Sequence, residues 1–454
     1  MSRPGRRRVG VLDLPWILME ARHPMHVAGV LVCRLPADAS ASFVPDLVRT
    51  MKRTAPSEPF DRRLHRRGLG RVWPWWESVA QVELDEHVRI DALDRPGTDR
   101  ELAALVSQFH GEPLALTRPP WQLRFVTGLD ERRFAIYAKF HHALVDGVGA
   151  TRILLSALSA DPMDRGRPPF WAPEAGDGHA ASRGGERPRV GHLLGAARSA
   201  GRELLGAGTA AYRAPRTILN PAIGARRQVT TMTVDIARLR RVAGAIGGTI
   251  NDVYLTACSS ALRRYLDDAG ALPHSPVVAA VPVSVRAPDG DRAGNAITFA
   301  FVPLPTDVEG AANRAAATIA ATTIAKADLA TVPRPAMAAY TVLTMAPVIA
   351  AQVLGLGARA RPMFNLAVSN VPGPSDTQFY NGVELLGIHP VSLLQAGQAL
   401  NVTALSCGGR LHITFTASPD ALAGTHRLAH YVTDALDELE DAHEGPDTPA
   451  RPAR

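Results

Sequence analysis

The sequence predicts an α/β protein with two domains, and three observations lead to this prediction. The chain has 454 residues, too many for one ordinary hydrophobic core. Hydrophobic residues make up 46% of it and charged residues 20%, which is enough apolar material for a large interior and excludes a disordered chain. Strand and helix patterns occur in both halves, on either side of a stretch rich in Pro, Gly and Arg. We therefore expect two similar halves.

The domain boundaries follow from the composition along the chain. An N-terminal domain is expected over residues 1–165. A linker rich in Pro, Gly and Arg then extends to Arg189, and a more apolar segment over 190–218 is expected to form an interdomain helix. The linker and this helix together occupy 166–225, and the C-terminal domain covers 226–454.

In the N-terminal half, the clearest element is a strand over 134–142, where apolar residues alternate with a period of two. This alternation places the adjacent residues His141 and His142 on opposite faces, with His142 on the face of the aromatic and aliphatic side chains. A helix is expected soon after, over 151–159.

In the C-terminal half, apolar residues at helical spacing predict a helix that starts near Asn251, with Thr249 and Asp252 placed as a capping box. The remaining apolar runs have strand length and suit a sheet covered on both faces. The further elements expected are strands over 277–285, 296–304 and 364–371, a hairpin of 400–406 and 411–417 around Gly408 and Gly409, and a closing helix over 425–439.

One segment, 336–357, has no charged residue and is long enough to cross a membrane. Much of its apolarity comes from Ala, Pro347 lies in its middle, and Thr341, Thr344 and Gln352 interrupt it. We therefore expect a buried or membrane-surface helix pair rather than a membrane span.

The net charge and the cysteines limit which partners and which cellular compartment we expect. The net charge of +7 is modest for this length, and the sequence has neither a Lys-rich tract nor an aromatic ladder, so nucleic acid is not an expected partner. Cys33, Cys258 and Cys407 are far apart and lack C-x-x-C spacing, so we expect no disulfide frame and no zinc site. Asp13 and Pro15 interrupt the start before a signal-type apolar run develops. A reducing, cytoplasmic compartment is predicted.

The chemistry is expected in the segment His141-His142-Ala-Leu-Val-Asp146-Gly147, which follows the strand and precedes the helix. An imidazole is the natural acceptor for the proton of an alcohol at neutral pH. Asp146 could hold the loop, and Gly147 would let the backbone turn tightly or a substrate approach. The sequence has no G-x-S-x-G elbow and no cysteine in a catalytic context, which favours direct attack over a covalent intermediate.

Two other interpretations of the histidines are a metal site and buried structural side chains. Because adjacent strand residues face opposite ways, both imidazoles cannot easily join one metal site, and no metal is expected.

The same segment resembles the HHxxxDG signature of coenzyme A dependent acyltransferases, and further motifs from residue 9 to residue 425 narrow the resemblance to the bacterial wax ester synthase/diacylglycerol acyltransferase family. These motifs follow in family order: Leu12-Asp13 through Glu20, His23-Pro-Met25-His26-Val27, Pro120-Trp121 through Gly128, Asn251-Asp252-Val253, Pro282-Val-Ser284-Val-Arg286, Gly294-Asn295 and Ser369-Asn370-Val-Pro-Gly373-Pro374. The family's PLW reads Pro119-Pro120-Trp121 here, which could alter the entrance beside that strand.

The resemblance implies two chloramphenicol-acetyltransferase-like domains, each a mixed sheet with flanking helices, and a tunnel between them. It implies His142 as the general base and His141 and Gly147 as supporting residues. Asn251 is a candidate donor to the oxyanion, with a helix cap beside Thr249 as its alternative role. Asp252 has helix capping as its expected role. Asp146 would brace the loop through an arginine, with Arg286 as a candidate.

The implied reaction is acyl transfer from long-chain acyl-coenzyme A to diacylglycerol, without a cofactor, at the inner face of the membrane or at a lipid body. Fatty alcohols are the rival acceptors, which would make the enzyme a wax ester synthase. The acyl donor could instead be a carrier protein, and the chain could be a catalytically idle paralogue that binds lipid. Two arginine groups could bind coenzyme A phosphates or anionic lipid head groups, or form a solvated face: Arg62, Arg63, Arg66, Arg67 and Arg71, and Arg226, Arg227, Arg238, Arg240 and Arg241.

Overall fold

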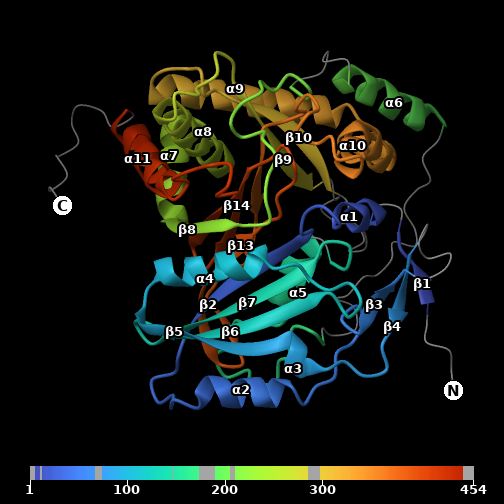
Figure 1. Cartoon of the computed structure of the whole chain (residues 1–454). Coiled ribbons are helices and arrows are strands. Elements are labelled where there is room, and N and C mark those ends of the chain that lie inside the picture. The colour runs from blue at the N-terminus through green and yellow to red at the C-terminus, as the bar shows by residue number, and fades with distance from the viewer. Residues whose placement is uncertain are drawn as a thin grey trace.

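The computed structural model describes residues 6–10, 13–66, 74–145, 147–172, 190–204, 210–284 and 297–442. Two six-stranded sheets form the centres of two halves, which lie one above the other in Figure 1. The expected α/β class with mixed sheets is confirmed.

The sheet of the lower half has the order β12-β13-β2-β7-β6-β5 and is antiparallel except for the parallel pair of β5 and β6. Its strands are β2 (His26–Arg34), β5 (Val88–Gly97), β6 (Trp121–Leu129), β7 (Arg133–His141), β12 (Gln378–Tyr380) and β13 (Val383–Val391). A small sheet beside it has the order β1-β4-β3, formed by β1 (Arg6–Arg8), β3 (Arg62–His65) and β4 (Trp75–Ser78).

The sheet of the upper half has the order β10-β9-β11-β14-β15-β8, with β11 parallel to both of its neighbours. Its strands are β8 (Gln228–Asp235), β9 (Val277–Ser284), β10 (Ile297–Leu304), β11 (Leu366–Val371), β14 (Leu400–Cys407) and β15 (Arg410–Ala417). The strands expected in this half are therefore confirmed. The hairpin of β14 and β15 turns at Gly408 and Gly409, whose φ angles of 56° and 75° suit a tight turn that only glycine adopts without strain.

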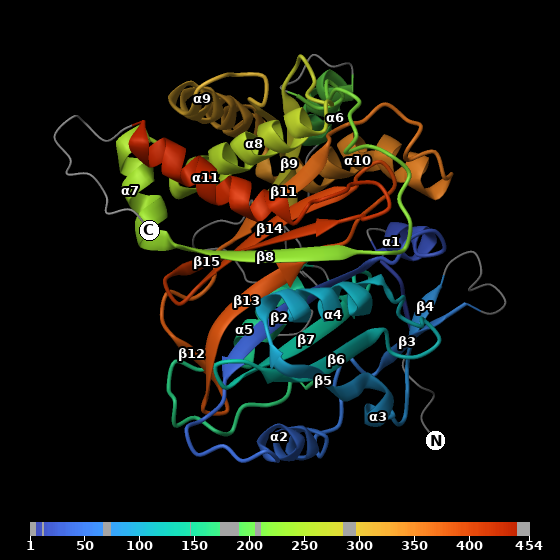
Figure 2. The same cartoon turned by 60° about the vertical axis from the view of Figure 1, so that its left-hand side comes forward.

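Helices cover both sheets, as Figures 1 and 2 show. They are α1 (Leu14–Met19), α2 (Phe43–Met51), α3 (Leu84–His87), α4 (Asp99–Gly111), α5 (Gly147–Ser156), α6 (Val190–Leu204), α7 (Ile236–Ile246), α8 (Ile250–Asp268), α9 (Ala311–Ala330), α10 (Met337–Val353) and α11 (Arg427–Asp441). A short 3-10 helix, η2 (Arg334–Ala336), precedes α10. On the upper sheet, α7, α8, α9 and α11 share one apolar core with the strands.

Strand β7 has the predicted alternation, and its two faces belong to different cores. Phe140 packs in the core that contains α5 residues such as Leu154. Tyr137 packs on the opposite face, with Val106 and Phe109 of α4. The sheet is thus covered on both sides, and Ala143, Leu144 and Val145 after β7 belong to the same core as Phe140.

The predicted domain boundaries do not account for one segment of the C-terminal region that joins the N-terminal sheet. Strands β12 and β13 lie in the region assigned to the C-terminal domain, but β13 pairs with β2 from Arg34 to Ala28 and so joins the N-terminal sheet. The segment 378–391 therefore belongs to the lower half. The expected linker falls mostly outside the described residues.

Two helix predictions need correction. The segment 336–357 is not a helix pair, because α10 runs unbroken through Pro347. It is not buried either, because only 28% of the most apolar stretch of this helix lies inside the protein. Pro347 lies on the exposed face, where the loss of its helical hydrogen bond does not leave a carbonyl buried in the protein. The interdomain helix is shorter than expected, since α6 covers Val190–Leu204 and residues 210–218 are not helical. Cys33, Cys258 and Cys407 are free and buried.

Candidate active site

The turn after β7 is held by backbone hydrogen bonds from three sides. The His141 N–H donates to the Pro120 carbonyl over 3.0 Å, and the His142 N–H donates to the Met25 carbonyl over 2.8 Å. The Leu144 and Val145 N–H groups donate to the His141 carbonyl. These hydrogen bonds fix the backbone position of both histidines.

His141 faces the protein interior and is fully buried. Its Nδ1 accepts a hydrogen bond from the Ala143 N–H over 3.1 Å, so in the neutral ring the proton sits on Nε2. Nε2 lies 3.3 Å from the carboxylate of Glu20. This side chain therefore holds the turn and the end of α1 together.

His142 is only partly buried, and its ring stacks on Trp16 of α1. The ring centroids are 4.1 Å apart and the ring planes are inclined by 29°. Trp16 therefore limits the rotation of the imidazole, a constraint on ring orientation that a proton-transferring group requires.

Helix α1 presents Trp16 and Glu20 on one side because the two residues are four positions apart. The Glu20 carboxylate also accepts a hydrogen bond from the Met25 N–H over 2.5 Å. Glu20 thus contacts the chain segment that binds the His142 backbone, and Trp16 contacts the His142 ring.

A group of buried basic residues lies behind the turn. Burial lowers the pKa of His26 well below its ordinary value, and it lowers that of His110 to about 3, so both rings are neutral at pH 7. Burial also lowers the pKa of Lys139 to about 8, and its ammonium donates to the carbonyls of Phe109 and Glu112. Lys139 is therefore the charged member of this group at neutral pH.

Gly147 begins α5, and a Cβ added there would meet open space. Its φ angle does not lie in the left-handed region, so the expected tight turn is not its role, whereas an approach of substrate stays a prediction. Asp146 and Arg286 lie outside the described residues, and so does the predicted contact between them.

Asn251 lies in the first turn of α8, and its Oδ1 accepts a hydrogen bond from Nδ2 of Asn370 on β11 over 3.4 Å. This contact joins two of the motifs that the sequence singled out. Within the described part of the chain, no acceptor binds the Nδ2 hydrogens of Asn251. Asn251 therefore retains a donor that a developing oxyanion could use.

Asp252 caps α8, as expected. Its carboxylate accepts hydrogen bonds from the N–H and the hydroxyl of Thr249 and a third, over 2.7 Å, from the hydroxyl of Thr322 on α9. Burial alone would raise the pKa of Asp252, but these hydrogen bonds outweigh it and leave the pKa below its ordinary value. Asp252 is thus a buried, ionised link between α8 and α9.

The histidine turn and the asparagine pair come from different halves, and the apolar core of the lower half connects them. Val371, the residue after Asn370, packs against the core that contains Ala143, Leu144 and Val145 of the turn. Leu405 and Cys407 of β14 lie in the same core. This core therefore links β11, the strand that carries Asn370, to the lower half, in which the histidine turn lies.

The comparison with known families decides the identity of this arrangement. The model of the wax ester synthase/diacylglycerol acyltransferase catalytic domain matches residues 11–254, and that of the WS/DGAT C-terminal domain matches residues 293–440. The chain belongs to the wax ester synthase/diacylglycerol acyltransferase family.

Similar proteins extend over nearly the whole chain. Two relatives from Mycobacterium tuberculosis, both named diacylglycerol O-acyltransferases, are 35% and 34% identical and cover 96% and 95% of this chain and 97% and 98% of their own. The structure of a wax ester synthase/diacylglycerol acyltransferase from Marinobacter aquaeolei is 31% identical, covers 96% of this chain and 100% of its own, and has a TM-score of 0.78. This wax ester synthase/diacylglycerol acyltransferase homologue is therefore an enzyme of the acyl-coenzyme A dependent class.

A condensation domain of the calcium-dependent antibiotic synthetase shares the fold, with a TM-score of 0.59 at 17% identity over 99% of this chain and 100% of its own. The chloramphenicol-acetyltransferase-like architecture expected for the wax ester synthase/diacylglycerol acyltransferase family is thus confirmed. The tunnel between its domains stays a prediction.

Sequence analysis assigned no role to Trp16, Glu20 or Asn370. Trp16 and Glu20 have a local signal, since a spacing of four residues in a short helix brings two side chains to one side. Asn370 lies in a motif that the resemblance singled out, but no local pattern pairs it with Asn251, which is 119 positions away in the sequence.

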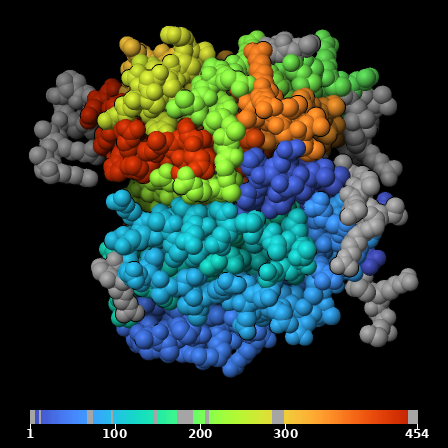
Figure 3. All heavy atoms as spheres, in the orientation of Figure 1, coloured from blue at the N-terminus to red at the C-terminus, as the bar shows by residue number. Residues whose placement is uncertain are grey.

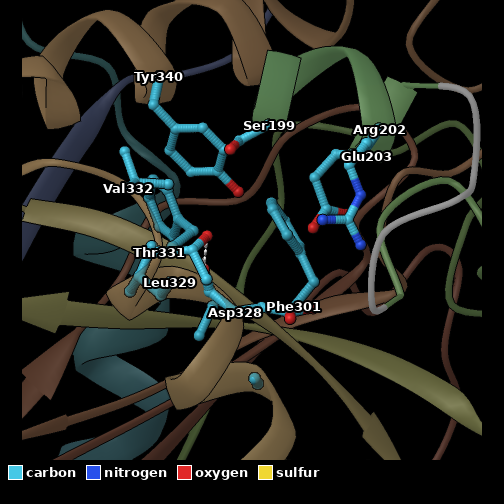
Figure 4. A pocket seen from close by; sticks show the side chains of 12 residues that line it. Ser199, Arg202, Glu203, Phe301, Asp328, Leu329, Thr331, Val332 and Tyr340 are labelled. Atoms are coloured by element: carbon cyan, nitrogen blue, oxygen red, sulfur yellow. Dashed lines mark hydrogen bonds between the residues drawn. The ribbon is translucent and has the colours of Figure 1, made fainter. Parts of the chain in front are cut away.

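A separate pocket lies away from the histidine turn, in the upper half of this wax ester synthase/diacylglycerol acyltransferase homologue. It is a small hollow, partly open to solvent, between α6, α9, α10 and β10, and Figure 4 shows Tyr340 and Phe301 among its lining side chains. No residue of β7 or α1 lines it, so it is not the place where His142 would react.

Four residues of the two arginine groups interact within the protein or are buried in it. Arg62 pairs with Glu58, Arg226 with Asp420, and Arg238 with Asp437 and Glu440. Arg227 is buried, which lowers its pKa to about 10. Arg62, Arg227 and Arg238 are therefore mostly buried, whereas the Arg226 side chain is 74% exposed, and phosphate or head-group binding by the two groups stays a prediction.

Proposed function

We propose that this protein transfers a long-chain acyl group from acyl-coenzyme A to the free hydroxyl of diacylglycerol, forming triacylglycerol and coenzyme A. The observation that carries the proposal is the stacking of the His142 ring on Trp16, in a partly exposed residue of a chain that belongs to the wax ester synthase/diacylglycerol acyltransferase family. The names of the two Mycobacterium tuberculosis relatives support diacylglycerol as the acceptor.

In the proposed mechanism, His142 accepts the proton of the acceptor hydroxyl as its oxygen attacks the thioester carbonyl. A C–O bond forms and the carbonyl π electrons move to the oxygen, which gives a tetrahedral oxyanion. When this intermediate collapses, the C–S bond breaks and the protonated His142 returns its proton to the coenzyme A sulfur. Proton and charge balance without a covalent enzyme intermediate.

Asn251 is proposed to stabilise the oxyanion through its Nδ2 hydrogens. Asn370 supports this role because it binds the opposite end of the Asn251 amide and so fixes its orientation. One such donor contributes about 3 to 4 kcal/mol to the transition state in other enzymes.

Long-chain alcohols are the second candidate acceptors, supported by the similarity to the Marinobacter aquaeolei wax ester synthase/diacylglycerol acyltransferase. We further propose that the enzyme works in the cytoplasm, at the inner face of the membrane or at a lipid body, because both acceptors are insoluble in water.

The test is thiol release from palmitoyl-coenzyme A by the purified full chain, with dioleoylglycerol or hexadecanol in detergent micelles and with product lipids separated by chromatography. Diacylglycerol-dependent release with formation of triacylglycerol is expected. Faster release with hexadecanol would make the protein a wax ester synthase instead. Lipid binding without acceptor-dependent release would support the idle paralogue and overturn the proposal.

A further inference from the structure

Helix α10 exposes a face with no polar residue. The residues of α10 that are exposed are all apolar, and they fall on one side of the helix: Ala338, Val342, Leu343, Ala346, Pro347 and Ala350. Leu354 and Leu356, which follow the helix, are 67% and 43% exposed. A surface helix of a water-soluble protein normally has the opposite arrangement, with its apolar stripe turned inward.

The polar residues of α10 face the protein. Thr341 donates a hydrogen bond to Thr298 of β10 over 2.8 Å, and Gln352 donates to the Ala396 carbonyl over 2.7 Å. Thr344 is buried and Tyr340 lines the pocket shown in Figure 4. These contacts bind α10 along its length to the protein, so the helix lies on the surface rather than extending away from it.

The charge around this face has one sign. No Asp or Glu occurs from residue 329 to residue 375, whereas Arg334 precedes the helix and Arg359 and Arg361 follow it, all three exposed. Helix α6 packs against α10 and adds the exposed Arg198 and Arg202. Its one acidic residue, Glu203, is buried.

Figure 3 shows α10 on the outside of the molecule, between α6 and α1. Helix α1 contacts α10 and carries the exposed Leu18, while Trp16 of the same helix stacks on His142. The apolar face is thus one helix away from the histidine turn.

We propose that the outer face of α10, with Leu354 and Leu356, docks on an anionic phospholipid surface and lies in its interfacial region. We call this set of residues the docking face. Apolar side chains that enter the head-group boundary and arginines that meet anionic lipids are the two elements of interfacial binding. A second copy of the chain fits less well, because a two-fold contact would bring the arginine rims of both copies together.

Docking in this orientation would bring the lipid surface to α1. It would let a lipid acceptor reach the side of His142 from the membrane while acyl-coenzyme A arrives from water. This consequence rests on the proposed function, whereas the docking itself can be measured without any acyl transfer.

The test is co-sedimentation of the full chain with vesicles of phosphatidylcholine alone or mixed with phosphatidylglycerol. The double variant Val342→Asp/Leu343→Asp places charges on the docking face. The matched control is Ile324→Asp, since Ile324 is 56% exposed on α9, away from this face. Circular dichroism spectra equal to that of the wild type establish that the variants are folded.

The wild type and Ile324→Asp should bind the mixed vesicles, with weaker binding at high salt, and the double variant should lose at least about tenfold in partitioning. Replacing Arg359 or Arg361 by Ala should cost about fivefold each. Equal binding by the double variant, equal binding to neutral vesicles, or a wild-type dimer that the double variant dissociates would each overturn the proposal.

A water-soluble short-chain alcohol separates this proposal from the function. With that acceptor, the double variant should release thiol as fast as the wild type, because the docking face lies outside the reacting groups. If the wild type releases no thiol with any acceptor but binds vesicles, the proposed function fails and the docking proposal stands. If it acts on every acceptor but ignores vesicles, the docking proposal fails alone.

Discussion

Replacing Asp252 by Ala tests whether the ND motif serves the helix or the chemistry. The carboxylate is 3% exposed and accepts three hydrogen bonds, two from Thr249 and one from Thr322. The loss of a capping side chain costs about 1 kcal/mol. The loss of a buried hydrogen bond to a charged group costs about 1.5 to 3 kcal/mol.

The net loss is smaller than the sum, because both threonines can form hydrogen bonds elsewhere. Thr249 is exposed, so its N–H can bind water, and the Thr322 hydroxyl already contacts the Ile319 carbonyl at 3.1 Å. We therefore expect Asp252→Ala to lower the free energy of unfolding by about 2 kcal/mol, which is measurable without unfolding a protein of ordinary stability.

Equilibrium urea unfolding measures this change, and the neighbouring variant Asn251→Ala is the control. Asn251→Ala should leave the unfolding midpoint almost unchanged and lower kcat by about a hundredfold. Asp252→Ala should instead lower the unfolding midpoint and change kcat much less. Unchanged stability in Asp252→Ala together with a large loss of kcat would refute the capping role.

Three further outcomes are expected. Glu20→Ala should lower kcat about tenfold with little change in KM, because the turn at His141 shifts. Glu20→Gln keeps an acceptor for the Met25 N–H, so its kcat should stay nearer that of the wild type. Equal increases of KM in both variants would contradict a positioning role. The pKa of Lys139 in the folded protein, about 8, lies below its ordinary value of 10.5, so the unfolded chain binds this proton more tightly between pH 8 and pH 10.5. The free energy of unfolding of the wild type, relative to that of Lys139→Met, should therefore rise from pH 8 to pH 10. Urea unfolding at each pH measures this difference. Asp252 should also make stability rise with pH, but at acid pH, because its pKa is lowered in the folded protein. Its contribution to the free energy of unfolding is complete above its ordinary pKa of 3.8 and is lost as the pH falls through the lower folded pKa. The wild type and Asp252→Asn should therefore converge in stability at this low pH, as urea unfolding would show.

The parts of the fold that could be predicted are those with local causes. The capping box of Thr249 and Asp252, the alternation along β7 and the glycine turn between β14 and β15 each depend on a few adjacent residues. Sequence analysis also recognised the histidine turn, because its residue types and spacing are local.

The parts that could not be predicted depend on contacts between distant residues. Strand β13 has an ordinary strand pattern, and only its pairing with β2, where Val391 lies opposite Ala28, assigns it to the other half. The apolar run of α10 has the same composition whether its outer face meets protein, water or lipid, so tertiary packing decides its exposure. The stacking of Trp16 on His142 likewise requires the folded chain.

The most direct test of the account is the activity of His142→Ala, because the whole mechanism depends on this imidazole. The measurement is acceptor-dependent thiol release from palmitoyl-coenzyme A, with the variant shown to be folded by its urea unfolding curve. The account predicts a loss of at least about a hundredfold in kcat, as expected when a general base is removed. A folded His142→Ala variant with wild-type activity would contradict it.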